Sequence, residues 1–251
     1  MINAKHYNNR KANILNIVLI CFLIVLLFFS GTKIVIWYMN NQNNKKISDE
    51  IAEFVTVDET KEDNEEKYVV DFEKLKEKNS DIVAWLKVNG TNIETTVVKT
   101  TNNDYYLTHN FNKEYNSAGW IFADYKNKVD GTDKNLVIYG HNMRDDSMFG
   151  SLKWVINEDW YNNEDNKYIT LITENETQVY EVFSVYQIEK EDYYIQTNFD
   201  TEKEFNTFAQ TIKKRSKKDF NVDVNENDNI LTLSTCANNN KYRVVLHAKK
   251  I

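Results

Sequence analysis

The sequence predicts a mainly β fold, and three observations lead to this prediction. Apolar and polar residues alternate in several short runs, which is the period of a half-buried strand. Turn-forming pairs such as Asn89-Gly90 and Asp130-Gly131 separate these runs. The 251 residues are 41% hydrophobic, which is enough for one core plus accessory segments. The pattern fits a closed barrel and a sandwich equally well.

Near its N-terminus the chain has an apolar run, from Ile14 to Thr32, that few polar residues interrupt. Its length suits a membrane crossing better than a buried core helix. Three basic residues precede the run and no acidic residue occurs before Asp49, which favours a cytoplasmic N-terminus and an exported C-terminal part. A cleaved signal peptide is the alternative. No small-x-small cleavage site follows the run, so we expect an uncleaved single-pass anchor.

We expect four segments in the chain. They are a basic cytoplasmic tail at 1–13, a transmembrane signal anchor at 14–36, a polar acidic linker or stalk at 37–67 and a folded extracellular domain at 68–251. Residues 1–50 carry six basic against two acidic side chains, a balance of +4; because the total is −7, residues 51–251 carry −11. Such an acidic body argues against a nucleic-acid partner.

The strands and helices can be placed along the chain from the same patterns. A short amphipathic helix is expected around Ile47 and Ile51, and a second one begins near Asp71. A short helix is expected around 148–155, and the longest one at 201–215, where Thr201 and Glu204 form a capping box. The expected strands are Trp85–Val88, Thr95–Val98, Trp120–Ala123, Leu136–Tyr139, Tyr168–Thr173, Val179–Ile188, Leu231–Cys236 and Tyr242–His247.

Cys236 is the one cysteine of the predicted exported part, because Cys21 lies in the apolar run. An unpaired cysteine outside the cell indicates a reactive thiol or an intermolecular bridge. A small buried structural cysteine is the alternative. If the last two strands pair as a hairpin, Arg243 comes back beside the sulfur of Cys236; otherwise it is an ordinary surface arginine.

His141 is the best placed of the four histidines to act as a base. It follows a strand that ends in Gly140, where a side chain can be held firmly and still be exposed. His6 lies before the anchor, His109 in a polar loop and His247 within the last strand. By itself, a histidine at a strand end is more often a surface or hydrogen-bonded residue.

Three stretches are far more specific in combination than any of these residues alone. They are Tyr139-Gly140-His141-Asn142-Met143, Thr232-Leu233-Ser234-Thr235-Cys236 and Arg243-Val244-Val245. Their order and spacing resemble those of the sortases, over most of residues 68–251. The likeness is to class B, because of Thr101-Asn102-Asn103-Asp104-Tyr105-Tyr106-Leu107, Ser147-Met148-Phe149 and a helix placed ahead of Arg215-Ser216.

The resemblance implies a fold and an activity. Sortases are membrane-anchored cysteine transpeptidases with an eight-stranded closed β-barrel, and class B members add N-terminal helices and a helix between strands six and seven. The implied reaction cleaves the C-terminal sorting signal of a surface protein after Thr, at a Thr–Gly or Thr–Asn bond. The acyl group is held as a thioester on Cys236 and passed to an amine of peptidoglycan.

The roles of the three catalytic candidates agree with their chemistry. Cys236 acts as the nucleophile through its thiolate. His141 protonates the departing amine as imidazolium and deprotonates the incoming amine as imidazole. Arg243 is a permanent cation with a rigid donor fork, which suits it to steady an oxyanion or to orient the peptide.

The resemblance also implies a groove for the sorting peptide. Four of the residues assigned to this groove have a simpler interpretation. Leu107, Tyr194 and Ile195 would then be ordinary core residues, and Ser234 a hydroxyl on a strand. Only six residues separate Cys236 from Arg243, which is short for class B. The groove candidates are Asn102, Leu107, Tyr194, Ile195 and Ser234.

No cofactor is expected, because no histidine and cysteine cluster has metal-ligand spacing. The expected partners are sorting-signal peptides, a peptidoglycan amine and the membrane, the last through residues 14–36. Two other classes of function stay open from the sequence. A papain-like hydrolase would use the same cysteine and histidine without transfer, and an anchored non-enzymatic receptor would not need Cys236.

Overall fold

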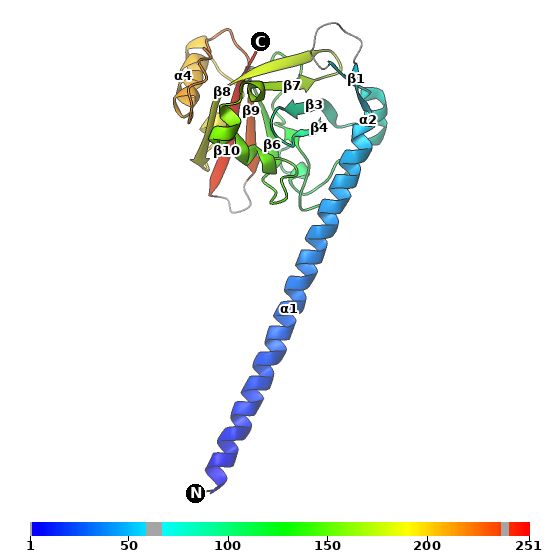
Figure 1. The fold of residues 1–251 in the computed structure, drawn as a ribbon, viewed down its shortest axis with the longest axis vertical. Helices are drawn as coiled ribbons and strands as arrows, with labels where there is room; N and C mark the ends of the chain where they lie inside the picture. The colour runs from blue at the N-terminus through cyan, green and yellow to red at the C-terminus, as the bar shows by residue number, and fades with distance from the viewer. Residues whose placement is uncertain (1, 59–66, 237–240) are drawn as a thin grey trace. The chain divides into compact units, whose positions relative to one another are not determined.

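The structure is a computed structural model that describes residues 2–58, 67–236 and 241–251, with the backbone alone for residues 2–13 and for Cys236 (Figure 1). The chain separates into two compact units, Met1–Asn43 and Asn44–Ile251. Each is described by itself below.

One long helix, α1 (Ile2–Ala52), makes up the first unit and enters the second. Its large apolar side chains from Ile14 to Met39 are exposed, and among the described residues it is the helix that is long and apolar enough to cross a membrane. The short amphipathic helix expected around Ile47 is therefore the end of α1 and not a separate element. No proline or glycine occurs between Thr32 and Ala52, so nothing in this stretch breaks the helix.

The second unit is built on a closed barrel of eight strands (Figure 1). Around the barrel the order is β10-β8-β7-β3-β4-β5-β6-β9. Pairs β4–β5 and β6–β9 are parallel, and the other pairs that are described are antiparallel. The strands are β3 (Ile82–Val88), β4 (Glu94–Val98), β5 (Phe122–Ala123), β6 (Asn135–His141), β7 (Tyr168–Ile172), β8 (Thr177–Glu189), β9 (Ile230–Cys236) and β10 (Tyr242–Lys250).

The barrel confirms the predicted fold class and decides between barrel and sandwich. Each of the expected strands is present, with ends that differ by a few residues. Alternation identified them because apolar side chains such as Trp85, Phe183 and Leu233 fill the core. In β6 and β9 the other face is buried as well, with polar residues such as Thr232 and Ser234.

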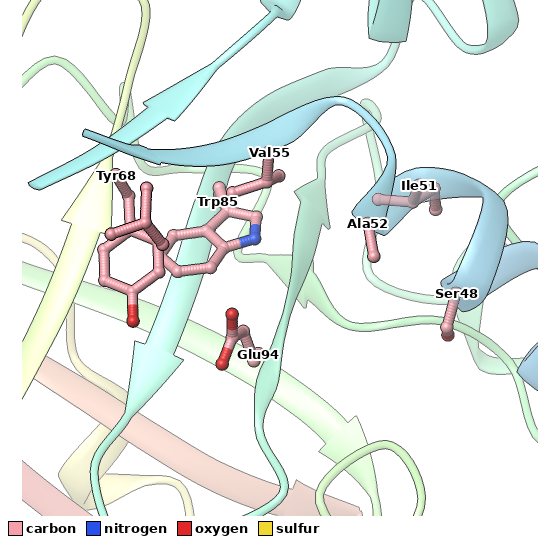
Figure 2. A pocket seen from close by; sticks show the side chains of 8 residues that line it. Ser48, Ile51, Ala52, Val55, Tyr68, Trp85 and Glu94 are labelled. Carbon is pink, nitrogen blue, oxygen red and sulfur yellow. The ribbon is translucent and has the colours of Figure 1, made fainter. Parts of the chain in front are cut away.

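A two-stranded sheet of β1 (Val55–Asp58) and β2 (Lys67–Val70) precedes the barrel. The sequence did not predict this sheet: β1 lies in the stretch predicted as a linker, and β2 begins at the last residue of that stretch. The acidic run at 59–66 between them lies outside the described residues. Together with the end of α1 and with β3 and β4, this sheet encloses a hollow of about 280 Å³ (Figure 2).

Helices cover parts of the barrel as expected. Helix α2 (Phe72–Lys78) begins after Asp71, whose carboxylate accepts a hydrogen bond from the backbone N–H of Lys74 at 3.0 Å. The helix predicted around 148–155 is instead the 3₁₀ helix η2 (Gly150–Ile156), followed by the short α3 (Glu158–Tyr161) and the 3₁₀ helix η3 (Glu164–Lys167).

The helix predicted at 201–215 is α4 (Glu202–Lys214), inserted between β8 and β9, which are the sixth and seventh barrel strands. Thr201 Oγ1 accepts the backbone N–H of Glu204 at 3.1 Å, as a capping box requires. The reciprocal bond differs from the prediction, because the Glu204 carboxylate accepts the N–H of Asp200 at 2.8 Å.

Candidate active site

Two of the three catalytic candidates lie side by side at one rim of the barrel. Strand β6 ends at His141 and β9 ends at Cys236, and the two strands run parallel. Their register pairs His141 directly with Cys236. Neighbouring strands are about 4.8 Å apart and directly paired residues share a face, so a histidine and a cysteine meet at this strand end. The Cys236 side chain itself lies outside the described residues.

Arg243 comes to the same rim from the other side of β9. Strands β9 and β10 are antiparallel, with Val245 opposite Ser234. The paired stretch ends at Ser234, and at the next position the Val244 N–H donates to the Thr235 hydroxyl at 2.9 Å, so Arg243 lies on β10 two residues beyond its last pair with β9. The half-buried Arg243 also pairs with Ile188 of β8, and its Nη1 donates to the backbone oxygen of Tyr242 at 3.0 Å.

The ring of His141 is oriented by a backbone carbonyl. Its Nε2 lies 2.8 Å from the carbonyl oxygen of Leu107. Because a carbonyl oxygen can only accept, Nε2 must carry the hydrogen. The other ring nitrogen, Nδ1, is then the one that can take up or release a proton in the reaction.

Backbone hydrogen bonds hold the residues on both sides of Leu107. The carbonyl before it, of Tyr106, accepts the N–H of Trp120 at 2.9 Å, and the carbonyl after it, of Thr108, accepts the N–H of Asn116 at 2.8 Å. The acceptor for His141 is therefore held on both sides by the chain that returns toward β5.

Asn102 forms hydrogen bonds within the same loop. This exposed residue accepts the backbone N–H groups of Asp104 and Tyr105 on its Oδ1, each at 2.9 Å. The 3₁₀ helix η1 (Tyr105–Leu107) begins at this point. Asn102 thus stabilises the turn that ends in Leu107, whose side chain packs half-buried against the core.

Two other groove candidates are joined to each other. Tyr194 lies on the 3₁₀ helix η4 (Tyr193–Ile195), and its hydroxyl is 3.0 Å from Ser234 Oγ. Both side chains are buried, and Ile195 packs half-buried beside the core. Ser234 pairs with Tyr139 two residues before the His141–Cys236 pair, so this hydrogen bond lies near the strand ends.

The buried carboxylate of Asp124, which was not among the residues predicted from the sequence, links β6 to the loop that carries Asn102. Asp124 Oδ2 accepts the Tyr139 hydroxyl and the Asn103 amide, each at 2.8 Å. It therefore ties the strand that carries His141 to the loop that carries Asn102. In one sequence, nothing distinguishes Asp124 from any other aspartate that follows a strand.

His247 is excluded as a base of the site by its surroundings. It is fully buried, with Nε2 2.8 Å from the Tyr186 hydroxyl and Nδ1 2.8 Å from Thr232 Oγ1. The Thr232 hydroxyl donates to Asn135 at 2.6 Å, so it accepts from His247 Nδ1, while Tyr186 donates to Nε2. Loss of water on burial, with a contribution from the positive charge of Arg215, lowers the pKa of His247 to about 3.

No group of three or more His, Cys, Asp or Glu side chains in the described parts of the chain could hold a metal ion.

The residues gathered near the rim offer a strand-end thiol position, an oriented imidazole and a guanidinium. This set can carry out nucleophilic acyl chemistry with the protein's own side chains.

Comparison with known proteins decides the family. Residues 86–251 match the model of the Sortase domain. The chain belongs to the sortase family. Sortase B of Listeria monocytogenes is 35% identical over 227 residues, which cover 89% of this chain and 91% of that protein.

Solved sortase structures have the same fold. Clostridium perfringens sortase B is 41% identical with a TM-score of 0.67, over 72% of this chain and 99% of the other. Bacillus anthracis sortase B in complex with AAEK1 is 34% identical with a TM-score of 0.74, over 85% and 99%. This sortase is a class B cysteine transpeptidase, as the resemblance predicted, and its family is that of the cell-wall sorting enzymes.

Proposed function

We propose that this sortase is an anchored enzyme that cleaves the sorting signal of surface proteins after Thr and transfers them to a peptidoglycan amine. The observation that carries the proposal is the direct pairing of His141 with Cys236 at one rim, with Arg243 on the neighbouring strand β10, two residues beyond its last pair with β9. Each residue then has one role in a double acyl transfer.

In the first half-reaction the thiolate of Cys236 attacks the carbonyl carbon of Thr in the sorting signal. A carbon–sulfur bond forms, and the carbonyl oxygen takes up the negative charge. When the tetrahedral intermediate collapses, the carbon–nitrogen bond breaks and the imidazolium of His141 gives its proton to the departing amine. The acyl group stays on Cys236 as a thioester.

In the second half-reaction an amine of the peptidoglycan stem or cross-bridge attacks the thioester. Neutral His141 accepts the proton that this amine loses, and Cys236 leaves as a thiolate. The enzyme returns to its starting state, and one amide bond has been exchanged for another. Because Cys236 and His141 account for every bond and proton exchanged, the proposed reaction needs no cofactor.

Arg243 stabilises the oxyanion that forms in each half-reaction. Its guanidinium stays charged throughout, and its donors have a fixed geometry that a lysine cannot copy. Backbone N–H groups near Cys236 could share this task.

The sorting peptide would lie along the exposed Asn102 and the half-buried Leu107 and Ile195, and the buried Tyr194 and Ser234 would support the groove from beneath. Hydrogen bonds support two sides of this groove. Asn102 accepts backbone N–H groups at the start of η1, and the Tyr194 and Ser234 hydroxyls are bonded to each other. Cleavage after Thr and the exact recognition motif are part of the proposal.

Residues 14–36 would serve as a single-pass signal anchor, with residues 1–13 in the cytoplasm, a stalk at 37–67 and the catalytic domain at 68–251 outside the cell. The exposed apolar face of α1 supports this assignment. Cell fractionation and protease accessibility test it: the intact chain should stay in the membrane fraction with its C-terminal domain accessible from outside. Release of a shortened chain into the medium would instead indicate a cleaved signal peptide.

The reaction itself is tested with peptides that contain a Thr–Gly or a Thr–Asn bond, with and without an amine acceptor such as oligoglycine. We expect the acceptor to increase turnover and to appear in the product as a new amide. Hydrolysis at a rate that no acceptor changes would support a papain-like hydrolase.

A further inference from the structure

A buried asparagine near the end of α1 is bonded entirely to one turn of the barrel domain. Asn44 is 2% exposed. Its Nδ2 donates to the carbonyl oxygen of Gly119 at 3.1 Å, and its Oδ1 accepts from Asn116 Nδ2 at 2.8 Å. Asparagine is a poor helix former and its amide is costly to bury without partners, so these two bonds explain its presence.

The turn held by Asn44 touches the peptide that orients His141. Gly119 has a φ of +59°, and a Cβ placed there would lie 2.3 Å from the oxygen of Tyr106 and 3.0 Å from that of Leu107. The turn is closed by the N–H of Gly119, which donates to Asn116 at 2.9 Å. Its backbone therefore packs directly against the Leu107 carbonyl.

These contacts form one continuous chain from α1 to the catalytic histidine. Asn44 holds Gly119, Gly119 packs on the Leu107 carbonyl, and that carbonyl accepts Nε2 of His141 at 2.8 Å. We propose that Asn44 is a positioning residue for His141, acting through the 116–119 turn. The inference rests on the proposed role of His141 as the proton carrier.

The chemical consequence concerns the charged form of the histidine. The Leu107 carbonyl accepts a stronger hydrogen bond from an imidazolium than from a neutral ring. If the 116–119 turn moves, this acceptor is displaced, the bond that orients the ring is weakened and Nδ1 is misaligned with Cys236. A misplacement of about 1 Å can reduce turnover by about 100-fold, even from a residue far from the reacting atoms.

The next turn of α1 provides a matched control. Figure 2 shows Ser48, Ile51 and Ala52 beside the hollow that Trp85 and Glu94 also line. Ser48 is half-buried on the same helix, one turn after Asn44, but it faces this hollow and not the 116–119 turn. Ser48→Ala therefore changes the same helix without touching the chain to His141.

The test uses the full-length chain in detergent micelles and compares Asn44→Ala, Asn44→Asp and Ser48→Ala. Asn44→Asp is nearly isosteric, keeps the acceptor for Asn116 and removes the donor to Gly119. For both Asn44 variants we expect kcat for peptide cleavage to fall by about 10- to 100-fold with little change in KM. The pH–rate profile should also shift. Ser48→Ala should leave kcat and the profile unchanged.

A second pair of variants keeps the test decisive if the Asn44 variants fold poorly. Gly119→Ala inserts a Cβ against the Leu107 carbonyl, whereas Gly131→Ala places one at a comparable positive φ of +80°, next to the Glu176 side chain. Gly119→Ala should reproduce the loss of kcat and the shifted profile, and Gly131→Ala should only lower the melting temperature.

The inference is overturned if Asn44→Asp and Gly119→Ala lower the melting temperature but keep the kcat and pH profile of their controls. His141→Ala separates this result from failure of the proposed function. If His141→Ala is inactive while Asn44→Asp is normal, only the positioning role is wrong. If His141→Ala retains activity, the catalytic assignment is wrong as well.

Discussion

His141 pairs directly with Cys236 in the parallel ladder between β6 and β9. The two residues are 95 positions apart in the chain, yet each is the last residue of its strand. Parallel strands bring their carboxyl ends to one edge, so the ladder places a histidine beside a cysteine without any loop rearrangement. Rigid strands hold such a pair more accurately than loops do.

Arg243→Lys should lose most of the activity although the charge is retained. Removal of one oxyanion donor typically costs about 3–4 kcal/mol, and a lysine cannot reproduce the planar fork. We therefore expect kcat to fall by about 100- to 1,000-fold. Lys241→Arg, at an exposed position two residues earlier, is the control and should turn over normally. Near-native turnover in Arg243→Lys would remove Arg243 from the mechanism.

Tyr194 and Ser234 should be energetically coupled. Their hydroxyls are 3.0 Å apart and both are buried, so removing one leaves the other without this partner. We expect Tyr194→Phe and Ser234→Ala each to destabilise the fold by about 1 kcal/mol. The double variant should be less destabilised than the sum of the two, because the second change no longer breaks a bond. Additive effects in denaturant unfolding would show that the pair contributes nothing.

Acid should destabilise the domain partly through His247. Burial lowers its pKa to about 3 in the folded state, below the value of about 6.5 expected in the unfolded chain. The unfolded state therefore binds the extra proton first. The contribution of neutral His247 to stability is complete above about pH 6.5 and is lost as the pH falls toward 3.

This pH dependence can be measured by comparing denaturant unfolding of the wild type and of His247→Gln at pH 7 and pH 4. Glutamine can keep one hydrogen bond to Tyr186 or Thr232 but cannot take up a proton. We expect the loss of stability between the two pH values to be smaller in His247→Gln. A loss of stability of the same size in both proteins would show that His247 does not contribute to the acid sensitivity.

Local sequence patterns predicted much of the barrel. Alternation identified the strands because their inward residues, such as Leu231 and Leu233, are fully buried. Helix spacing with an N-cap threonine identified α4 within one residue at each end. The three catalytic candidates came from strand ends and from the family resemblance. The ladder pairs His141 with Cys236, and Arg243 lies on the neighbouring strand β10.

The parts that were missed depend on contacts between distant residues. Helix α1 continues to Ala52 because nothing interrupts it, and the β1–β2 sheet forms in a stretch whose charge suggested a linker. The bond from His141 to Leu107 joins residues 34 positions apart, and the bond from Asn44 to Gly119 joins residues 75 apart. A periodic pattern contains no information about such pairs, so only the folded chain reveals what orients the histidine.

The central claim is that a peptide acyl group is carried on Cys236 with His141 as the proton carrier. The most direct measurement is mass spectrometry of the full-length enzyme after mixing with a sorting peptide and no amine acceptor. We predict a hydroxylamine-sensitive adduct on Cys236 that ends in Thr, absent in Cys236→Ala and strongly reduced in His141→Ala. An adduct on another residue, or peptide transfer by Cys236→Ala, would contradict the account.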